Sequence, residues 1–265
     1  MYDFAYHRPC SLKDALALLA ESPEARPLAG GQTLLPVMKQ RLAAPSALVD
    51  LSGVPELRGI DLSPQAVTIG ALTTHAEIAE SAEVTQAIPA LSAMAAKIGD
   101  QQVRHRGTLG GSIANNDPAA DYPAALLGLD AVVVTDRREI AAADFFIDIL
   151  ETALQPGELV VAVRFPIPRT AAYARMDQPA SRFALVGVFV GVMQDGGVRV
   201  AVTGAGPCVF RQGEMETSLT HSFRPEALAG LDIAAEGLNS DLHGSPEYRA
   251  HLIGVLARRA VVACL

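Results

Sequence analysis

The spacing of apolar residues in the first part of the chain predicts short amphipathic helices. Leucines within 12–19 fall on one helical face, and Ser11, two residues after Pro9, is placed to cap the first turn of that helix. The same spacing indicates a helix over 34–42, where Pro36 is tolerated because it lies in the first turn. Further helical segments are expected over 74–78, 89–98 and 245–259.

Runs rich in β-branched residues predict the strands of the protein. Short strands are expected at 47–51, 66–71, 131–135 and 159–165. Later in the chain, the runs 183–193 and 198–203 are joined by 194–197, whose Asp-Gly pair is a strong signal for a tight hairpin. Gly187 and Gly191 lie within the first of these β-rich runs, so their spacing indicates a closely packed strand rather than a helix–helix contact.

The segment Pro166-Ile167-Pro168 marks the main boundary that we predict along the chain. Its two prolines cannot donate to a β-ladder, so they end the strand expected at 159–165. A chain of 265 residues suits one or two domains with a sizeable core. We therefore expect one domain over 1–168 and a smaller one over 169–265.

The charge balance of the chain argues against two classes of partner. Lys and Arg number 21 against 29 Asp and Glu, which gives a net charge of −8. This excess of negative charge produces no field that would attract a nucleic-acid backbone or an anionic membrane. The longest apolar run, 183–193, is also well short of the roughly 18 residues that a membrane-spanning helix needs. We expect no nucleic-acid partner and no membrane span.

The cysteines and histidines give no sign of a metal site. Cys10, Cys208 and Cys264 lie far apart without a CxxC spacing, which argues against a disulfide framework and against zinc. An iron–sulfur cluster usually takes four cysteine ligands, so none is expected in this chain. The six histidines form no HExxH motif, and we predict no metal. The first residues lack the pattern of a secretory signal, so a cytoplasmic location is expected.

Two glycine pairs carry the strongest chemical signal. The segments 29–33 (Ala-Gly-Gly-Gln-Thr) and 108–112 (Thr-Leu-Gly-Gly-Ser) each lie near a predicted helix start. Glycine lets backbone N–H groups approach an anion without interference from a Cβ, and neighbouring hydroxyls add further donors. Each segment alone is compatible with an ordinary turn. Two segments of similar chemistry suit the opposite sides of one diphosphate.

The common nucleotide-binding motifs do not fit these segments. Neither glycine pair is followed by Gly-Lys-Ser or Gly-Lys-Thr, which a P-loop requires. The segment 204–209 has Val209 where a dinucleotide-binding fingerprint needs its third glycine. A Walker ATPase and a Rossmann dehydrogenase are therefore disfavoured.

A polar turn follows the second glycine pair. Asp117, Asp121 and two asparagines lie in this turn together with Pro118 and Pro123. Asx turns before proline explain most of this composition. The functional interpretation is that one of these aspartates anchors a nucleotide by a hydrogen bond to its ribose or adenine edge. An acid/base pair is the alternative, but the sequence marks no partner for it. No GxSxG motif occurs either, and we assign no catalytic residue.

Taken together, these segments resemble the FAD-binding medium subunits of molybdenum hydroxylases, the family of carbon monoxide dehydrogenase and xanthine dehydrogenase. The resemblance is carried by 28–36, 69–74 and 102–115, followed by Asp117-Pro118 and Asp121, and it extends over the whole chain. It implies an α+β fold. A two-lobed FAD-binding domain of the vanillyl-alcohol-oxidase (PCMH) type would span 1–168, with lobes of about 1–57 and 58–168. A smaller α+β domain of the CO dehydrogenase flavoprotein type would span 169–265.

The resemblance also implies which residues hold the cofactor. The diphosphate of FAD would lie between the two glycine pairs, and Asp121 would hold the adenosine half. Ile98 and Val160 would pack on the cofactor, and Arg175 stands where relatives often have a lysine near the flavin ring. The following segment, 177–182, departs from the basic pattern of the family. The full set implied is Ala29, Gly30, Gly31, Gln32, Thr33, Leu34, Ile98, Thr108, Gly110, Gly111, Ser112, Asn115, Asp121, Val160 and Arg175.

The function implied by the resemblance is that of an electron-transfer subunit. In the family, a small 2Fe–2S subunit delivers electrons to FAD, and a large molybdenum-cofactor subunit oxidises the substrate. The flavin then passes the electrons to an external acceptor such as NAD or a quinone. The absence of cluster cysteines and of a marked acid/base pair agrees with this role. Two alternatives stay open: a stand-alone FAD-dependent oxidase, and a non-enzymatic assembly subunit that has lost FAD.

Overall fold

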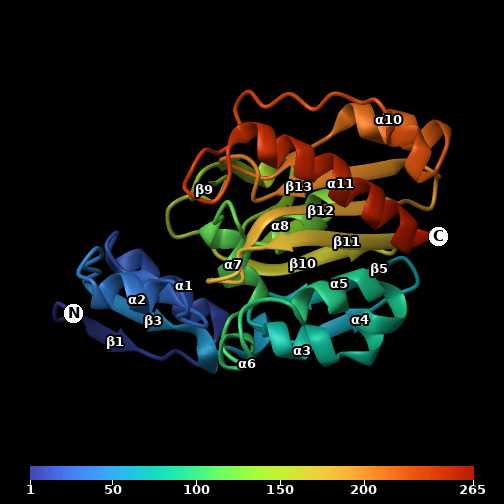
Figure 1. Cartoon of the computed structure of the whole chain (residues 1–265). Coiled ribbons are helices and arrows are strands. Elements are labelled where there is room, and N and C mark those ends of the chain that lie inside the picture. The colour runs from blue at the N-terminus through green and yellow to red at the C-terminus, as the bar shows by residue number, and fades with distance from the viewer.

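The computed structural model describes residues 1–265, which form three β-sheets and one short separate hairpin. Figure 1 shows the first sheet at the N-terminal end of the molecule, drawn in blue, and the last sheet beneath the long C-terminal helix, drawn in red. Helices of the middle part of the chain pack between and beside these sheets. No helix is long and apolar enough to cross a membrane.

The first sheet is parallel, with the order β1-β3-β2. Its elements are β1 (Ala5–His7), α1 (Leu12–Glu21), β2 (Arg26–Leu28), α2 (Leu34–Lys39) and β3 (Ala47–Asp50), followed by two 3-10 turns, η1 (Leu51–Gly53) and η2 (Pro55–Leu57). Ser11 caps α1, because its hydroxyl accepts a hydrogen bond from the backbone of Asp14 at 3.1 Å, as predicted. The helix expected over 34–42 is shorter than predicted, because Arg41 adopts a left-handed φ of 62°.

The second sheet is antiparallel, with the order β4-β5-β10-β6-β7. Its strands are β4 (Ile60–Leu62), β5 (Ala66–Gly70), β6 (Val132–Thr135), β7 (Glu139–Ala141) and β10 (Val160–Pro166). The helices of this part are α3 (His75–Glu80), α4 (Ala82–Ala87), α5 (Pro89–Ala95), α6 (Gln101–Arg104), α7 (Leu109–Asn115), α8 (Tyr122–Gly128) and α9 (Ala142–Phe145), and a hairpin pairs β8 (Phe146–Asp148) with β9 (Glu151–Thr152).

The region around the second glycine pair differs from the prediction. The sequence indicates a loop over 106–112 and then a polar turn, whereas the structure has α7 beginning at Leu109, with Thr108 as its N-cap. Gly110, Gly111 and Ser112 are therefore part of a helix. The next helix, α8, is missed because every one of its residues is buried. A helix without a polar face gives no amphipathic pattern to detect.

The third sheet is antiparallel, with the order β11-β12-β13-β14. Its elements are β11 (Thr170–Asp177), β12 (Ala184–Val192), β13 (Val198–Thr203) and β14 (Phe210–Arg211), followed by α10 (Gly213–His221), η3 (Pro225–Leu228) and α11 (Pro246–Cys264). The hairpin between β12 and β13 is confirmed, and Gly196 in its turn has a φ of 89°. β11 is missed by the sequence analysis, because its residues have little strand preference and pairing along β12 imposes the conformation.

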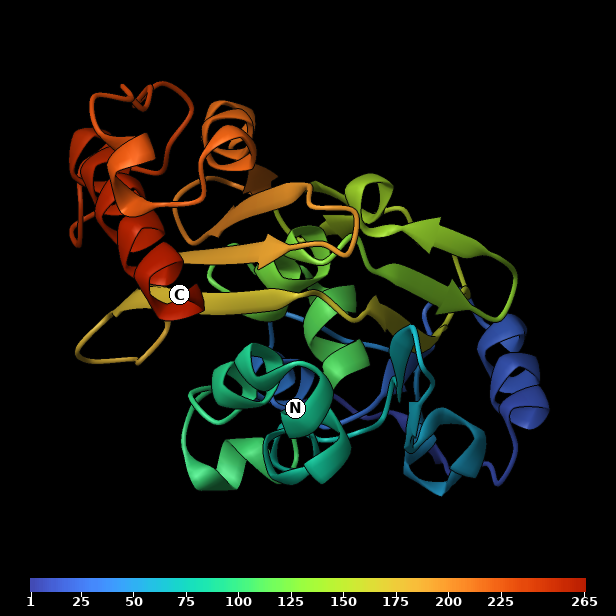
Figure 2. The ribbon, with the colours of Figure 1, turned by 90° about the vertical axis from the view of Figure 1, so that its right-hand side faces the viewer.

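The third sheet is buried on both faces. Figure 2 shows its strands, in yellow and orange, between α11 and the green helices of the middle of the chain. Val186, Val188 and Val190 pack with α11, whereas Phe189 between them belongs to the core of the N-terminal part. A Cβ on Gly191 would overlap the carbonyl oxygen of Gly128, at the end of α8. Gly187 and Gly191 therefore do mark a closely packed strand, as predicted.

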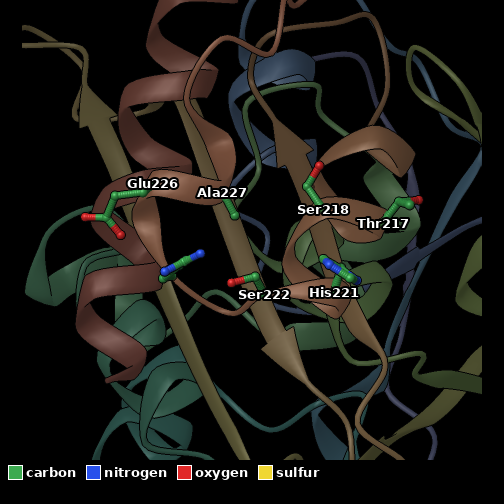
Figure 3. Close-up of a pocket in the computed structure, with 7 residues that line it drawn as sticks. Thr217, Ser218, His221, Ser222, Glu226 and Ala227 are labelled. Carbon is green, nitrogen blue, oxygen red and sulfur yellow. The ribbon is translucent and has the colours of Figure 1, made fainter.

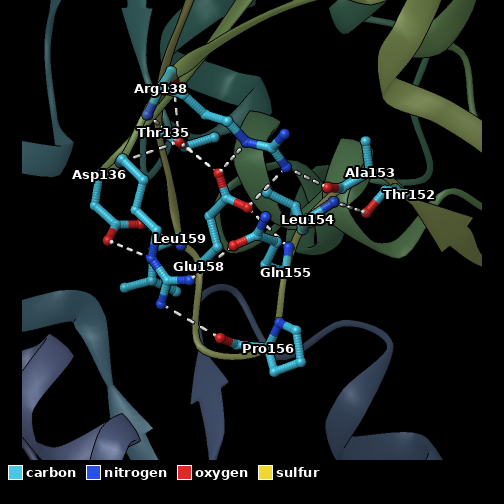
Figure 4. A network of polar contacts seen from close by, with 11 residues as sticks. Thr135, Asp136, Arg138, Thr152, Ala153, Leu154, Gln155, Pro156, Glu158 and Leu159 are labelled. Carbon is cyan, nitrogen blue, oxygen red and sulfur yellow. Dashed lines mark hydrogen bonds and ion pairs between the residues drawn. The ribbon is translucent and has the colours of Figure 1, made fainter.

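A buried carboxylate joins β10 to the β6–β7 turn. Figure 4 shows Glu158 accepting hydrogen bonds from Arg138, from the hydroxyl of Thr135 at 2.8 Å and from the backbone of Gln155 at 2.8 Å. Its side chain is 0% exposed. The hydrogen bond from Arg138 lowers the pKa of Glu158 to about 2 against the opposing effect of burial. Glu158 therefore stays ionised and holds the loop that leads into β10.

Glu158→Gln is expected to destabilise the protein by about 2 kcal/mol at pH 7, because a charge-assisted hydrogen-bond network is lost. The folded pKa lies below the unfolded value of 4.5, so this contribution is present above pH 4.5 and declines as the pH falls toward 2. Urea unfolding of both proteins at pH 7 and pH 4 measures it. The difference between them should be smaller at pH 4, and a constant difference would contradict the assignment.

Candidate functional site

The two glycine segments meet in the folded protein. A Cβ on Gly30 would overlap the carbonyl oxygen of Arg106 and lie 2.8 Å from the Cα of Gly107. The backbone of the first segment therefore lies directly against the backbone that leads into α7. A Cβ on Gly111 would lie 3.7 Å from the Cβ of Ala29, so the two segments face each other across this contact.

The two glycines of α7 have different surroundings. A Cβ on Gly110 would lie 2.6 Å from the Cβ of Ala71, and the backbone N–H of Gly110 donates to the Ala71 carbonyl at 2.8 Å. Gly110 is thus needed for the close packing of α7 beside β5. Near Gly111 a Cβ would meet only the hydroxyl of Thr108, at 2.9 Å, and Ala29. Gly111 is exposed, and no backbone atom lies close to the position of its missing Cβ.

The first glycine segment presents a row of free backbone donors. The N–H groups from Gly30 to Leu34 donate no hydrogen bond to any group of the chain, and Gly31 between them has a left-handed φ of 71°. Successive N–H groups around a left-handed residue form a concave anion site. The N–H groups from Leu109 to Ser112, by contrast, all donate hydrogen bonds within the chain. Their acceptors are the carbonyls of Thr73, Ala71 and Thr108 and the hydroxyl of Thr108. The first segment supplies the donors, and the second supplies a close wall at Gly111, which has no side chain.

A neutral histidine, His75, contacts Gly107, the residue directly before the second segment. The backbone N–H of His75 donates to the carbonyl of Gly107 at 3.0 Å, and its ring Nδ1 lies 3.3 Å from the Tyr122 hydroxyl. Burial, together with the charge of Arg104, lowers the pKa of His75 to about 4. A Cβ on Gly107 would lie 2.6 Å from the Nε2 of this ring. The sequence analysis missed His75, although it directly follows the segment 69–74.

Asp121 and Arg175 form a buried ion pair between the N-terminal part and β11. Nη1 of Arg175 donates to both carboxylate oxygens of Asp121 at 2.9 Å, and the Tyr173 hydroxyl donates to Oδ1 at 2.6 Å. Burial raises the pKa of Asp121, and both partners oppose that shift. Nη2 of Arg175 donates to the carbonyl of Lys97 at 2.7 Å, beside Ile98. The structure therefore brings together three of the predicted residues.

One side-chain donor just after β11, Nε2 of Gln178, is buried and has no hydrogen-bond acceptor in the chain. Nε of Arg175 is buried as well, and it lies 2.6 Å from Oδ1 of Asp177 as an ion pair. A buried amide without an acceptor costs about 1–3 kcal/mol. Gln178, which the sequence analysis did not select, therefore has a free donor for an acceptor that the chain does not supply.

The remaining predicted residues lie around the same region. Val160 is buried at the start of β10, in the same hydrophobic core as Ile113 of α7, and Ile98 packs against that core. Asn115 is the last residue of α7 and is half-buried. Gln32 and Thr33 are both exposed, directly before α2 begins. No cluster of three or more His, Cys, Asp or Glu side chains is arranged to hold a metal ion.

A polar hollow of about 460 Å³ lies elsewhere, in the C-terminal part. Figure 3 shows its lining side chains, which come from α10 and from the segment up to η3. His221 lines it from the end of α10, and Glu226 from η3. None of the predicted site residues lines this hollow.

The chain matches a known protein family. The family described as "FAD binding domain in molybdopterin dehydrogenase" matches residues 2–168. The carbon monoxide dehydrogenase medium chain of Hydrogenophaga pseudoflava is 34% identical over 276 residues, covering 98% of this chain and 96% of that protein. The nicotine 6-hydroxylase medium subunit of Paenarthrobacter nicotinovorans is 37% identical over 270 residues, covering 97% and 95%.

Solved structures agree with these sequence relatives. A chain of the reconstituted CO dehydrogenase from Oligotropha carboxidovorans superimposes with a TM-score of 0.93 at 34% identity, over 99% of this chain and 98% of that one. The two-lobed α+β fold expected from the sequence is thereby confirmed, over nearly the full length of both chains.

The different surroundings of the two α7 glycines predict different stabilities for their variants. Gly110→Ala should destabilise the fold by about 1–3 kcal/mol, because its Cβ meets the β5 end at Ala71. Gly111→Ala should cost about 1 kcal/mol or less, because it disturbs only the Thr108 cap. Guanidinium unfolding of the two variants measures this. Equal losses would contradict the distinction.

Proposed function

The chain belongs to the family of FAD-binding domains of molybdopterin dehydrogenases, and from that membership we propose that it is the FAD-binding electron-transfer subunit of a molybdenum-containing hydroxylase. The observation that carries the proposal is the row of free N–H groups from Gly30 to Leu34, in the segment whose Ala29 lies against Gly111. That row is suited to an anionic diphosphate. The chain also covers 95–96% of the length of relatives that are named medium chains or subunits.

The proposed cofactor site uses the residues that the sequence singles out. Residues 29–34 would hold the diphosphate, and 108–112 with Asn115 would form the opposite wall. Asp121 would hold the adenosine half, while Ile98 and Val160 would pack on the cofactor. Arg175, whose guanidinium donates to Asp121 at 2.9 Å, would lie at the same end of the cofactor as that carboxylate rather than at the flavin ring. The unsatisfied amide of Gln178 supports a neighbouring acceptor at that end, because its donor has no other partner. When bound, the flavin supplies the redox chemistry, and these residues bind and orient it.

The proposed partners follow from the medium-subunit relatives. We propose that a small 2Fe–2S subunit delivers electrons and that a large molybdenum-cofactor subunit oxidises the substrate. Relatives of similar identity are named for carbon monoxide and for nicotine, so the substrate is selected outside this chain. The acceptor would be NAD, a quinone or another oxidant.

Three cysteines without disulfides favour a cytoplasmic location. We place the domain boundary at Pro168, between β10 and β11.

The first test is cofactor binding. The purified chain should bind FAD and release FAD rather than FMN on denaturation, as chromatography of the pigment would show. Gly111→Val should abolish FAD retention in a folded protein, because a branched side chain fills the space between the two segments. Gly213→Val is the matched control, since a Cβ there meets nothing within 4 Å. Equal FAD binding by both variants would refute the placement of the site.

The second test is electron transfer. The isolated chain should oxidise no organic substrate, whereas its FAD should be reduced when the iron–sulfur subunit, the molybdenum subunit and their substrate are supplied. Each stable interface should bury at least about 1,000 Å². Rapid-mixing absorbance of the flavin, with and without the partner subunits, measures this. Substrate-dependent reduction by the chain alone would instead establish the stand-alone oxidase, and a chain that binds no FAD would point to the assembly subunit.

A further inference from the structure

The turn between α7 and α8 is held from the C-terminal sheet. The hydroxyl of Thr203, at the end of β13, donates to the carbonyl of Ala120 at 2.6 Å and to that of Pro118 at 3.1 Å. The backbone N–H of Gly204 donates to the same Pro118 carbonyl at 2.8 Å. Thr203 is only 1% exposed. The backbone of 117–121 is therefore fixed by a residue more than eighty positions later in the chain.

Strand register places Thr203 in one row with Arg175. Arg175 pairs with Gly187, and Gly187 pairs with Thr203, across β11, β12 and β13. A Cβ on Gly187 would overlap the Tyr173 hydroxyl and lie 3.0 Å from Cγ2 of Thr203. Glycine at this position leaves room for Tyr173 to reach Asp121. The row thus holds the turn at two places, through its carbonyls and through the Asp121 carboxylate.

The end of β13 is itself fixed by a buried cation. Nη1 of Arg249, on α11, donates to the carbonyl of Leu185 at 2.8 Å and to that of Gly204 at 2.9 Å, and its side chain is 3% exposed. Gly204 has a left-handed φ of 79°, and a Cβ there would lie 2.6 Å from the carbonyl of Ala184. The backbone bend directly after Thr203 is therefore held in place, which fixes where the Thr203 side chain begins.

From this arrangement we propose that Thr203 is a positioning residue for the FAD site: its hydroxyl sets the place of the turn that follows α7 and carries Asp121. This inference rests on the proposed function, because it assumes that FAD lies beside α7 and this turn. Thr203 does not itself face the two glycine segments. Its single hydroxyl hydrogen is shared between the two carbonyls. Without it the Ala120 carbonyl has no donor in the chain, whereas the Pro118 carbonyl keeps the N–H of Gly204.

Thr203→Val tests the role, because valine keeps the shape and removes the hydroxyl. The Kd for FAD should rise about tenfold, the equivalent of one hydrogen bond in affinity. Thr203→Ser should restore the wild-type Kd. Thr170→Val is the matched control: Thr170 lies on β11 of the same sheet, and its hydroxyl bonds only to the carbonyl of Cys264, at 3.2 Å. FAD titration followed by flavin fluorescence and thermal unfolding of the apoprotein are measured for each variant.

A role confined to stability would lower the melting temperature of both valine variants and leave both FAD affinities unchanged, which would overturn the inference. Support requires a raised Kd in Thr203→Val alone, with the flavin absorbance bands unaltered because Thr203 does not touch the ring. If Thr203→Val does not fold, Thr203→Ala also removes the hydroxyl, and Thr170→Ala then becomes its matched control. A wild-type chain that binds no FAD would overturn the proposed function together with the inference, whereas wild-type binding with equal affinity in Thr203→Val overturns the inference alone.

Discussion

The contact between the backbone of Gly30 and that of Arg106–Gly107 is the constraint on which the rest of the site depends. Gly30 follows β2 of the first sheet, and Arg106–Gly107 connects α6 to α7 in the part of the chain that forms the second sheet. A Cβ on Gly30 would overlap the Arg106 carbonyl, so a side chain there would push the two backbones apart. Their approach brings the free N–H groups of the first segment opposite α7. Burying such donors without an acceptor is unfavourable, so they must stay open to water or to an anion. A phosphate-binding surface is thus a direct result of how the first two sheets meet.

The fold could be predicted from the sequence where an element has one apolar and one polar face. Ser11 and the leucines of α1 give the helix and its start, and the Asp-Gly turn gives the β12–β13 hairpin. Two elements without an amphipathic pattern were missed. Every residue of α8 is buried, and β11 becomes a strand because it pairs along the whole length of β12. Both depend on neighbours distant in the chain, which local patterns do not encode.

The site shows the same limit. The glycine pairs were visible in the sequence, but the different surroundings of Gly110 and Gly111 were not. Gly110 packs against Ala71, whereas Gly111 is exposed and faces Ala29 of the first glycine segment. The partners of Asp121 lie 52 and 54 residues later, on β11. Only the folded chain shows that its carboxylate is paired with Arg175. His75 also gave no signal of its own, because its function depends on Gly107 and Tyr122 around the ring.

The C-terminal sheet has to satisfy two packing partners, which explains its sequence. One face meets α11, and the other face meets the core around α8, so β12 is almost entirely apolar. A strand buried on both faces has no room for polar side chains along its length. The polar contacts to the turn 117–121 therefore come from the neighbouring strands β11 and β13, through Arg175, Tyr173 and Thr203. Gly187, on β12 between them, leaves space for the side chains of Tyr173 and Thr203. The third sheet therefore both forms the hydrophobic core and holds the turn 117–121 in place.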